Sequence, residues 1–227
     1  MKRTFLPLLS LLVTLLISFG AQAQNKIKVA CVGNSITEGW GLKQTYPAAL
    51  QQLLGEAYEV RNFGVSGRTL LKKGDFPYWN EAKYQEALSW QPDIVIIKLG
   101  TNDSKPQNWK FKDEFVSDYV ALVNSFKALA SKPMVYVCAP IPVFEFKWGI
   151  TESIVKNEII PAVNRVAKQT KSQVIDLYTP FIGKANLTYD GIHPNDEGAA
   201  FLAAQVHQAM PRKIKKKTKL KAEKASK

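Results

Sequence analysis

Two residues far apart in the sequence could form the reactive pair of an acyl-transfer site. Ser35 lies in the segment GNSITEGW, directly after the apolar run IKVACV. A serine hydroxyl becomes a nucleophile when a base takes its proton, and a third group must orient that base. His193 is one of two histidines and follows Asp190 by three residues in the segment DGIHPN. In a tight turn, Asp190 could bond one ring nitrogen of His193 and leave the other facing Ser35.

Each of these residues also has an ordinary structural interpretation. Asn, Ser and Gly favour turns and helix starts, so Ser35 alone could be a turn residue. A lone D-x-x-H could be a surface turn, and His207 fits a surface or packing position in an amphipathic helix. GNSITEGW lacks the motifs of phosphate and dinucleotide sites, and Thr37 stands where a G-x-S-x-G elbow needs its second glycine.

Donors for a developing oxyanion follow two other apolar runs. Gly64 and Gly67 lie in NFGVSGRT, where the missing Cβ lets a backbone N–H approach a substrate closely. Asn102, in GTND, supplies a side-chain amide, and the backbone N–H of Ser35 would be a third donor. The alternatives are a tight turn for the glycines and a helix cap for Asn102.

The elements that must position these residues alternate between strand and helix. Short apolar runs predict strands at 27–33, 58–63, 94–99, 134–139 and 173–177. The stretches between them predict helices at 46–55, 80–90, 111–130, 152–169 and 195–210. Asn80 is the expected cap of the second helix, and Pro161 should kink or split the fourth. This alternation implies a parallel sheet between two helical layers, with ligands bound at the carboxyl ends of the strands.

Four segments in this order resemble the SGNH, or GDSL, esterase and lipase family: GNSITEG, NFGVSGRT, GTND and DGIHPN. The match extends from residue 27 to about residue 208, and the last two segments are the most diagnostic. The resemblance implies that Ser35 is the nucleophile, His193 the base and Asp190 its orienting acid. Asn34 and Ile36 depart from the letters GDSL, but neither belongs to the triad. The implied fold is an α/β, flavodoxin-like three-layer sandwich with a five-stranded parallel sheet.

The resemblance also implies the oxyanion donors. These are the backbone N–H groups of Ser35 and Gly67 and the side chain of Asn102, with Gly64 the weaker candidate in its segment. No cofactor is implied. No His, Cys and carboxylate cluster stands at ligand spacing, so we expect no metal site.

The sequence is less informative about the substrate. Trp40 and Trp79 are the main candidates for stacking on a sugar ring, and Arg68 could bind a substrate carboxylate. The expected loops also carry Tyr46, Tyr78, Trp109 and Trp148. Exported members of the family with similar segments often remove acetyl groups from glycans, so the resemblance suggests a carbohydrate O-acetylesterase. Lysophospholipase, thioesterase and arylesterase activities stay open, as does a non-catalytic glycan-binding protein. No long apolar stretch suggests a lid or acyl tunnel, which argues against a true lipase.

The first 23 residues have the pattern of a secretory signal peptide. Lys2 and Arg3 precede a long apolar run, which ends at the small-residue motif AQA. The run is short for a membrane span, so we expect cleavage before Gln24 and an exported protein without a transmembrane segment in its mature chain.

The basic charge is concentrated at the other end of the chain. Residues 211–227 hold nine of the 31 Lys and Arg residues, against Glu223 alone, and are predicted to form a solvated, disordered tail. The domain predicted at 24–210 carries 20 basic and 18 acidic residues. The net charge of +12 therefore does not indicate nucleic-acid binding. The sequence indicates no oligomeric state.

Three further residues interrupt or occupy the predicted strands. Cys31 and Cys138 lie inside apolar runs, and a chain of this length does not need a disulfide, so two buried free thiols are expected. Lys98 stands near the end of a strand, where an apolar residue is expected. We expect its side chain to reach past the sheet edge toward water or an acid.

Overall fold

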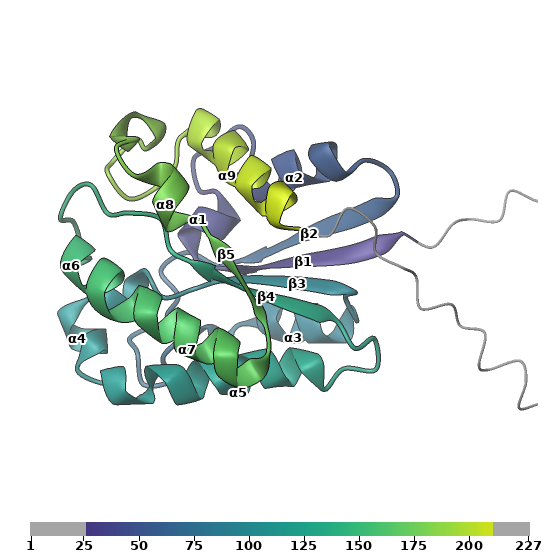
Figure 1. Cartoon of the computed structure of the whole chain (residues 1–227), viewed down its shortest axis with the longest axis horizontal. Coiled ribbons are helices and arrows are strands. Elements are labelled where there is room, and N and C mark those ends of the chain that lie inside the picture. The colour runs from purple at the N-terminus through teal and green to yellow at the C-terminus, as the bar shows by residue number, and fades with distance from the viewer. Residues whose placement is uncertain (1–25, 211–227) are drawn as a thin grey trace, which may run out of the picture.

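The computed structural model describes residues 26–210, which form a parallel sheet between two layers of helices (Figure 1). The sheet has five strands in the order β2-β1-β3-β4-β5. Their bounds are β1 (Ile27–Gly33), β2 (Tyr58–Gly64), β3 (Ile94–Lys98), β4 (Met134–Ala139) and β5 (Gln173–Asp176). The predicted fold class and all five predicted strands are confirmed. The predicted signal peptide and basic tail lie outside the described residues.

Helices cover both faces of the sheet (Figure 1). One face carries α1 (Ser35–Glu38), α2 (Tyr46–Leu54), α8 (Tyr178–Phe181) and α9 (Asp196–Ala209). The other carries α3 (Ala82–Ser89), α4 (Pro106–Trp109), α5 (Phe115–Lys127), α6 (Glu152–Ile154) and α7 (Ile160–Thr170). Within residues 26–210, no helix combines the length and apolar character that crossing a bilayer requires.

The central strands are apolar at every position because each face meets a separate core. Along β1, Val29 and Cys31 belong to the cluster beneath α2 and α9, which we call the upper core. Ala30 and Val32 belong to the cluster on the opposite face, beneath α3, α5 and α7. Side chains alternate between faces along a strand, so both sets must be apolar for the strand to be buried.

Two helix boundaries differ from the predicted ones. Asn80 is not a cap, because Glu81 precedes α3 and Asn80 closes a separate 3₁₀ turn, η1 (Tyr78–Asn80). The buried Tyr78 hydroxyl donates to the carbonyl of Phe63 at 2.6 Å, which anchors that turn to β2. The helix predicted from residue 111 begins at Phe115, after the 3₁₀ turn η3 (Lys112–Glu114).

The predicted break at Pro161 is confirmed. A π-helical turn, η4 (Val155–Ile159), separates α6 from α7, and Pro161 lies in the first turn of α7. Proline has no N–H to donate, so the wider turn ahead of it accommodates the missing hydrogen bond. The remaining 3₁₀ turns are η2 (Asn102–Ser104) and η5 (Ala185–Leu187).

The expectation for Lys98 is wrong, whereas that for the cysteines is confirmed. Lys98 is only 1% exposed, and its Nζ has no hydrogen-bond partner within residues 26–210. It lies on a buried face of the sheet, next to the place where α1 folds back over the ends of the neighbouring strands and Asn62 donates to the carbonyl of Thr37 at 2.8 Å. Cys31 and Cys138 are buried and free.

Candidate active site

Ser35, His193 and Asp190 form one chain of hydrogen bonds. Ser35 Oγ lies 2.8 Å from His193 Nε2, and His193 Nδ1 lies 2.7 Å from Asp190 Oδ2. The end of β1 and the loop before α9 meet at the carboxyl edge of the sheet, which brings together residues 158 positions apart. With Nδ1 donating to the carboxylate, Nε2 can accept the proton of Ser35.

The turn around Asp190 holds the carboxylate in its ionised form. Asp190 Oδ1 accepts the backbone N–H groups of Ile192 at 2.9 Å and His193 at 2.7 Å. Burial by itself would raise the pKa of Asp190, but these hydrogen bonds and the one to the His193 ring outweigh it. The pKa therefore lies below its ordinary value. Asp190 can fix the tautomer of the imidazole and stabilise the imidazolium that forms during reaction.

Ser35 is the first residue of the short helix α1, and its neighbours explain that position. The side chain of Asn34 caps the helix by accepting the N–H of Ile36 at 3.2 Å. A residue at the first helical position has no intrahelical acceptor for its own N–H. The Ser35 N–H is therefore available to a substrate oxygen.

The other two candidate donors also remain available. Gly67 has a φ of 78°, in the left-handed region, and a Cβ there would meet no atom within 4 Å. Asn102 is 5% exposed and donates one amide hydrogen to the carbonyl of Arg68 at 3.1 Å, which leaves its second amide hydrogen free. Asn102 is not a helix cap, since Thr101 holds that position before η2.

Gly64 has a packing role instead. A Cβ on Gly64 would lie 2.2 Å from the backbone nitrogen of Glu38, so only glycine lets α1 approach β2 this closely. Its own N–H already donates to Asn62 Oδ1 at 2.9 Å. Gly64 is therefore not available as an oxyanion donor, and Gly67 is the remaining candidate in its segment.

Two carboxylates that we did not single out in the sequence hold the Gly67 turn. Glu38 Oε2 accepts the N–H of Ser66 at 2.9 Å, and the two oxygens of Asp103 accept the N–H groups of Leu70 and Leu71 at 3.0 and 2.8 Å. Burial raises the pKa of Asp103 to about 6, against the opposing effect of those N–H groups. Both carboxylates lie in the segments GNSITEG and GTND, three residues after Ser35 and one after Asn102.

The predicted sugar-contacting residues divide into exposed and packed side chains. Trp40 is 70% exposed. Trp79 packs against the Tyr84 ring, and its indole N–H donates to the carbonyl of Leu70 at 2.8 Å. Arg68 Nε is paired with Glu81 at 2.6 Å, so its guanidinium already has a carboxylate partner. Trp40 is thus the one of these three that remains free to stack on a ligand. Tyr46, Tyr78 and Trp109 are buried in the cores.

Two exposed aromatic rings flank the imidazole of His193. The Tyr189 ring stacks on it, with centroids 5.6 Å apart and planes 11° from parallel, and the Trp148 ring meets it edge-on at 5.7 Å. Their exposures are 47% and 61%. Trp148 has a φ of 53°, an unusual conformation for a bulky residue. Its turn is tied to the loop that carries His193, because Lys147 Nζ donates to the carbonyl of Asp190. Tyr189 directly precedes the segment DGIHPN, which could have pointed to it.

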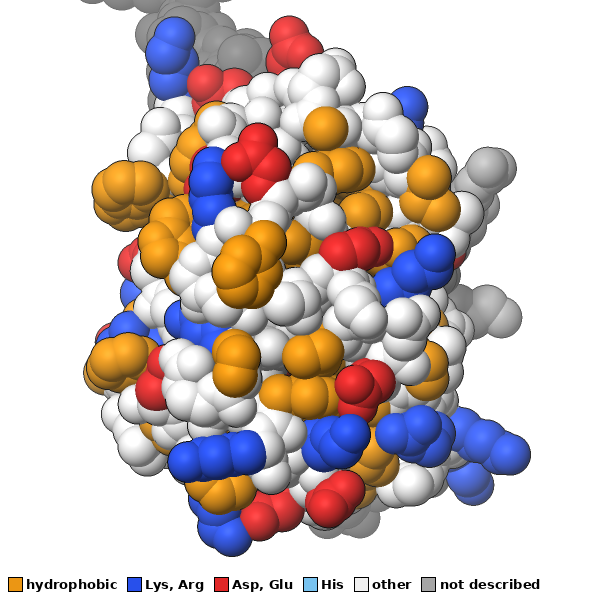
Figure 2. All heavy atoms as spheres, turned by 90° about the vertical axis from the view of Figure 1, so that its left-hand side faces the viewer, with side chains coloured by type: hydrophobic (Ala, Val, Ile, Leu, Met, Phe, Trp, Pro, Cys, Tyr) orange, Lys and Arg blue, Asp and Glu red, His pale blue; other side chains and the backbone are white. Residues whose placement is uncertain are grey.

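The strands end on the left-hand side of Figure 1, and Figure 2 shows that side of the molecule. Hydrophobic side chains form separate patches there, with acidic and basic side chains between them (Figure 2). The surface on this side is therefore mixed rather than one continuous apolar area, which differs from the surface expected for a long acyl chain.

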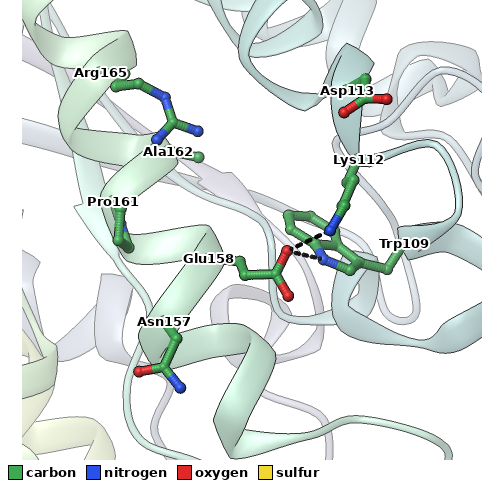
Figure 3. Close-up of a pocket in the computed structure, with 8 residues that line it drawn as sticks. All are labelled: Trp109, Lys112, Asp113, Asn157, Glu158, Pro161, Ala162 and Arg165. Atoms are coloured by element: carbon green, nitrogen blue, oxygen red, sulfur yellow. Dashed lines mark hydrogen bonds and ion pairs between the residues drawn. The ribbon is translucent and has the colours of Figure 1, made fainter.

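A separate hollow of about 270 Å³ lies between α4 and α7 (Figure 3). Trp109 Nε1 and Lys112 Nζ both donate to Glu158 there, each at 3.0 Å. The hydrogen bond from the Trp109 indole, followed by that from Lys112, lowers the pKa of Glu158. These bonds fasten two helical segments together, and the hollow shares no residue with the Ser35 site. Nowhere in residues 26–210 do three His, Cys, Asp or Glu side chains gather as metal ligands would.

A family model described as the GDSL-like lipase/acylhydrolase family matches residues 31–201, which include Ser35, Asn102 and His193. The chain belongs to the GDSL-like lipase/acylhydrolase family. The match covers most of the chain and includes all four segments from which the resemblance was inferred.

Relatives of this GDSL-like chain include acetyl-removing enzymes. It is 42% identical over 215 residues to an acetylxylan esterase of Xylanibacter ruminicola, covering 85% of this chain but only 45% of that protein. A crystal structure of an acetyl xylan esterase matches with a TM-score of 0.66 at 24% identity, over 82% of this chain and 100% of the other. A carbohydrate acetylesterase from Sinorhizobium meliloti matches with a TM-score of 0.65 at 24% identity, over 81% of this chain and 97% of the other. The two structures support the fold. The chain spans less than half the length of the Xylanibacter ruminicola relative.

Proposed function

We propose that this GDSL-like protein is a serine esterase that removes O-acetyl groups from carbohydrates through an acyl-enzyme. The observation that best supports this proposal is the hydrogen-bonded chain from Ser35 Oγ through His193 to the ionised Asp190, with distances of 2.8 and 2.7 Å. The names of the relatives supply the substrate class: an acetylxylan esterase and a carbohydrate acetylesterase.

The geometry supports a two-step reaction. Ser35 Oγ attacks the carbonyl carbon of the acetyl group while His193 Nε2 takes the hydroxyl proton. The oxyanion receives hydrogen bonds from the N–H groups of Ser35 and Gly67 and from the free amide hydrogen of Asn102. His193 then gives its proton to the sugar oxygen as the carbon–oxygen bond breaks. In the second step, water attacks the acetyl-serine with His193 as base, and acetate leaves.

The preference for acyl length tests this proposal. The side of the molecule at which the strands end is mixed in character, which gives a long acyl chain no advantage over an acetyl group there. We expect kcat/KM on p-nitrophenyl esters to be highest for the acetyl ester and to fall steadily toward twelve carbons, with release of acetate from acetylated xylan. A maximum at eight carbons or more would instead support a lipase or lysophospholipase. Absence of turnover and of labelling by a fluorophosphonate probe would support a non-catalytic binding protein.

We propose that Trp148 binds the sugar ring next to the scissile acetyl group. Its ring is largely exposed, lies edge-on to His193, and offers a face for stacking. Trp148→Ala should raise KM for acetylated xylan about tenfold. It should leave kcat/KM for p-nitrophenyl acetate within about twofold of the wild-type value, because the small ester does not extend to the Trp148 ring. Initial rates on the two substrates measure this, with Leu53→Ala as the control for an exposed apolar side chain at the end of α2 that leads into the start of β2. Equal losses on both substrates would mean that Trp148 supports His193 rather than the sugar.

We also propose that the protein is exported and that residues 24–210 are the catalytic unit. The basic start, apolar run and AQA motif support cleavage before Gln24. The mature protein should therefore begin at Gln24 outside the cytoplasm, which N-terminal sequencing from the native host would measure. Recovery of a chain that still starts at Met1 would contradict this.

A further inference from the structure

Lys98 is a buried charge that the proposed reaction does not use. It ends β3, four residues before Asn102, and its strand partner Gly33 lies two residues before Ser35. Its Nζ is buried without a partner among residues 26–210. Leaving an ammonium without hydrogen bonds in a protein interior is strongly unfavourable. The Lys98 ammonium therefore requires a polar ligand that the side chains and backbone of residues 26–210 do not supply.

The direction of the Lys98 side chain follows from the strand. Ile94 and Ile96 belong to the upper core, so alternation along β3 puts Lys98 on the same face. Thr37 of α1 reaches this place, because a Cβ on Gly33 would come within 2.1 Å of Thr37 Oγ1. Since Gly33 is the partner of Lys98 across the sheet, the Thr37 hydroxyl lies beside the base of the lysine side chain.

Two further polar atoms here are also buried without partners. They are Thr37 Oγ1 and the hydroxyl of Tyr46, which comes from α2. The Tyr46 hydroxyl lies close enough to Thr37 and the Cys31 thiol to interact with both, but neither contact has the geometry of a full hydrogen bond. Three unsatisfied polar groups thus share one compartment between the sheet, α1 and α2. Internal water, which typically makes about three hydrogen bonds, is the usual ligand of such groups.

The titratable groups that face Lys98 do not balance its charge. They are Cys31 from β1, Cys138 from β4 and Tyr46 from α2. Burial raises the pKa of both thiols to about 12, and that of Tyr46 well above its ordinary value, so all three are neutral near pH 7. Burial lowers the pKa of Lys98 to about 8. The ammonium therefore persists at neutral pH and is lost at moderately alkaline pH.

The helices around this compartment supply no counter-ion. Glu38 of α1 is bonded to Ser66, and α2 carries no charged residue. Asp196 and Glu197, at the start of α9, are exposed. None of these carboxylates is therefore the counter-ion of Lys98.

We propose that Lys98, Thr37 and Tyr46 bind internal water behind α1, and that this hydrated ammonium makes Lys98 a positioning residue for Ser35 and Asn102. The water links the end of β3 to α1, which fixes the separation between the two donors that these elements carry. The ammonium also supplies positive charge behind the place where the oxyanion develops. The kinetic part of this inference rests on the proposed esterase function.

The test compares Lys98→Met with Ile96→Met, a buried residue two positions earlier on the same face of β3. Both variants are made in the full chain and assayed on p-nitrophenyl acetate, with the uncatalysed rate subtracted. Lys98→Met should lower kcat at pH 7 about tenfold with KM within about twofold, since it disturbs positioning rather than binding. Ile96→Met should keep near-wild-type values.

The pH profile separates positioning by the ammonium from simple packing. Wild-type kcat should fall above about pH 8 as Lys98 loses its proton. Lys98→Met should lack the alkaline fall, whereas Ile96→Met should retain it. A Lys98→Met enzyme with wild-type kcat and an unchanged pH profile would overturn the positioning role.

The presence of internal water is tested by an experiment that does not depend on enzyme activity. A high-resolution crystal structure of the wild-type protein should show ordered water within about 3.2 Å of Lys98 Nζ and of at least one of the two hydroxyls. A dry compartment would overturn the hydration. If Lys98→Met fails to fold, the crystal structure and the pH profile of the wild-type enzyme still test the proposal. A wild-type kcat that stays level up to pH 9.5 would contradict the positioning role. A wild-type protein inactive on every ester would refute the proposed function while the structure still tests the water.

Discussion

Replacing Ser35 by alanine is expected to lower kcat for p-nitrophenyl acetate by roughly 10⁴–10⁶-fold. The substitution removes the oxygen that would form the acyl-enzyme, and His193 has no other nucleophile to activate at hydrogen-bond distance among the described residues. Oxyanion donors and substrate contacts remain, so residual activity should exceed that of free water. Covalent labelling by a fluorophosphonate probe should disappear, as read by intact-protein mass spectrometry.

Ser117→Ala provides the matched control for Ser35→Ala. Ser117 lies on α5, where its hydroxyl donates to the carbonyl of Glu114, away from the triad. It should keep both turnover and labelling. Both variants should melt near the wild-type temperature, because each loses one hydroxyl and no packed apolar group. Stoichiometric labelling that survives in Ser35→Ala would show that another residue is the nucleophile.

Replacing Asn102 by alanine is expected to lower kcat by roughly 10²–10³-fold with little change in KM. In the proposed role, the free amide hydrogen of Asn102 acts only where negative charge develops, so it would stabilise the transition state more than the bound ester. The probe should still label Ser35 in this variant, only more slowly. Asn102→Asp should be no faster, because a carboxylate would repel the oxyanion and face the Arg68 carbonyl that Asn102 now contacts.

Stability distinguishes this role from a purely structural one. Asn102 also ties η2 to the segment after Gly67 through its bond to Arg68, and losing one such bond costs about 1 kcal/mol. Asn102→Ala should therefore melt only slightly earlier, and Asn124→Ala, at an exposed position of α5, should change neither stability nor rate. A marked loss of stability with near-normal kcat would assign Asn102 to structure alone.

Local patterns in the sequence were sufficient to predict the strands and the residues of the candidate triad. The strands were predictable because their apolar, β-branched runs suit burial on both faces, as the two cores on either side of β1 confirm. The D-x-x-H spacing was sufficient to predict the contact between Asp190 and His193, because the two residues lie within one turn. That turn is local, so its geometry follows from neighbouring residues.

Only the tertiary structure decided which residues lie across from one another. Gly64 and Gly67 look alike in the sequence, but Gly64 lies against the backbone of Glu38 and Gly67 faces open space. Lys98 was expected to reach past the sheet edge, yet it is buried, and Trp148 meets His193 where its loop is tied to the carbonyl of Asp190. Such contacts join segments far apart in the chain. They depend on how helices pack over the ends of the strands, which residue spacing and hydrophobic periodicity do not specify.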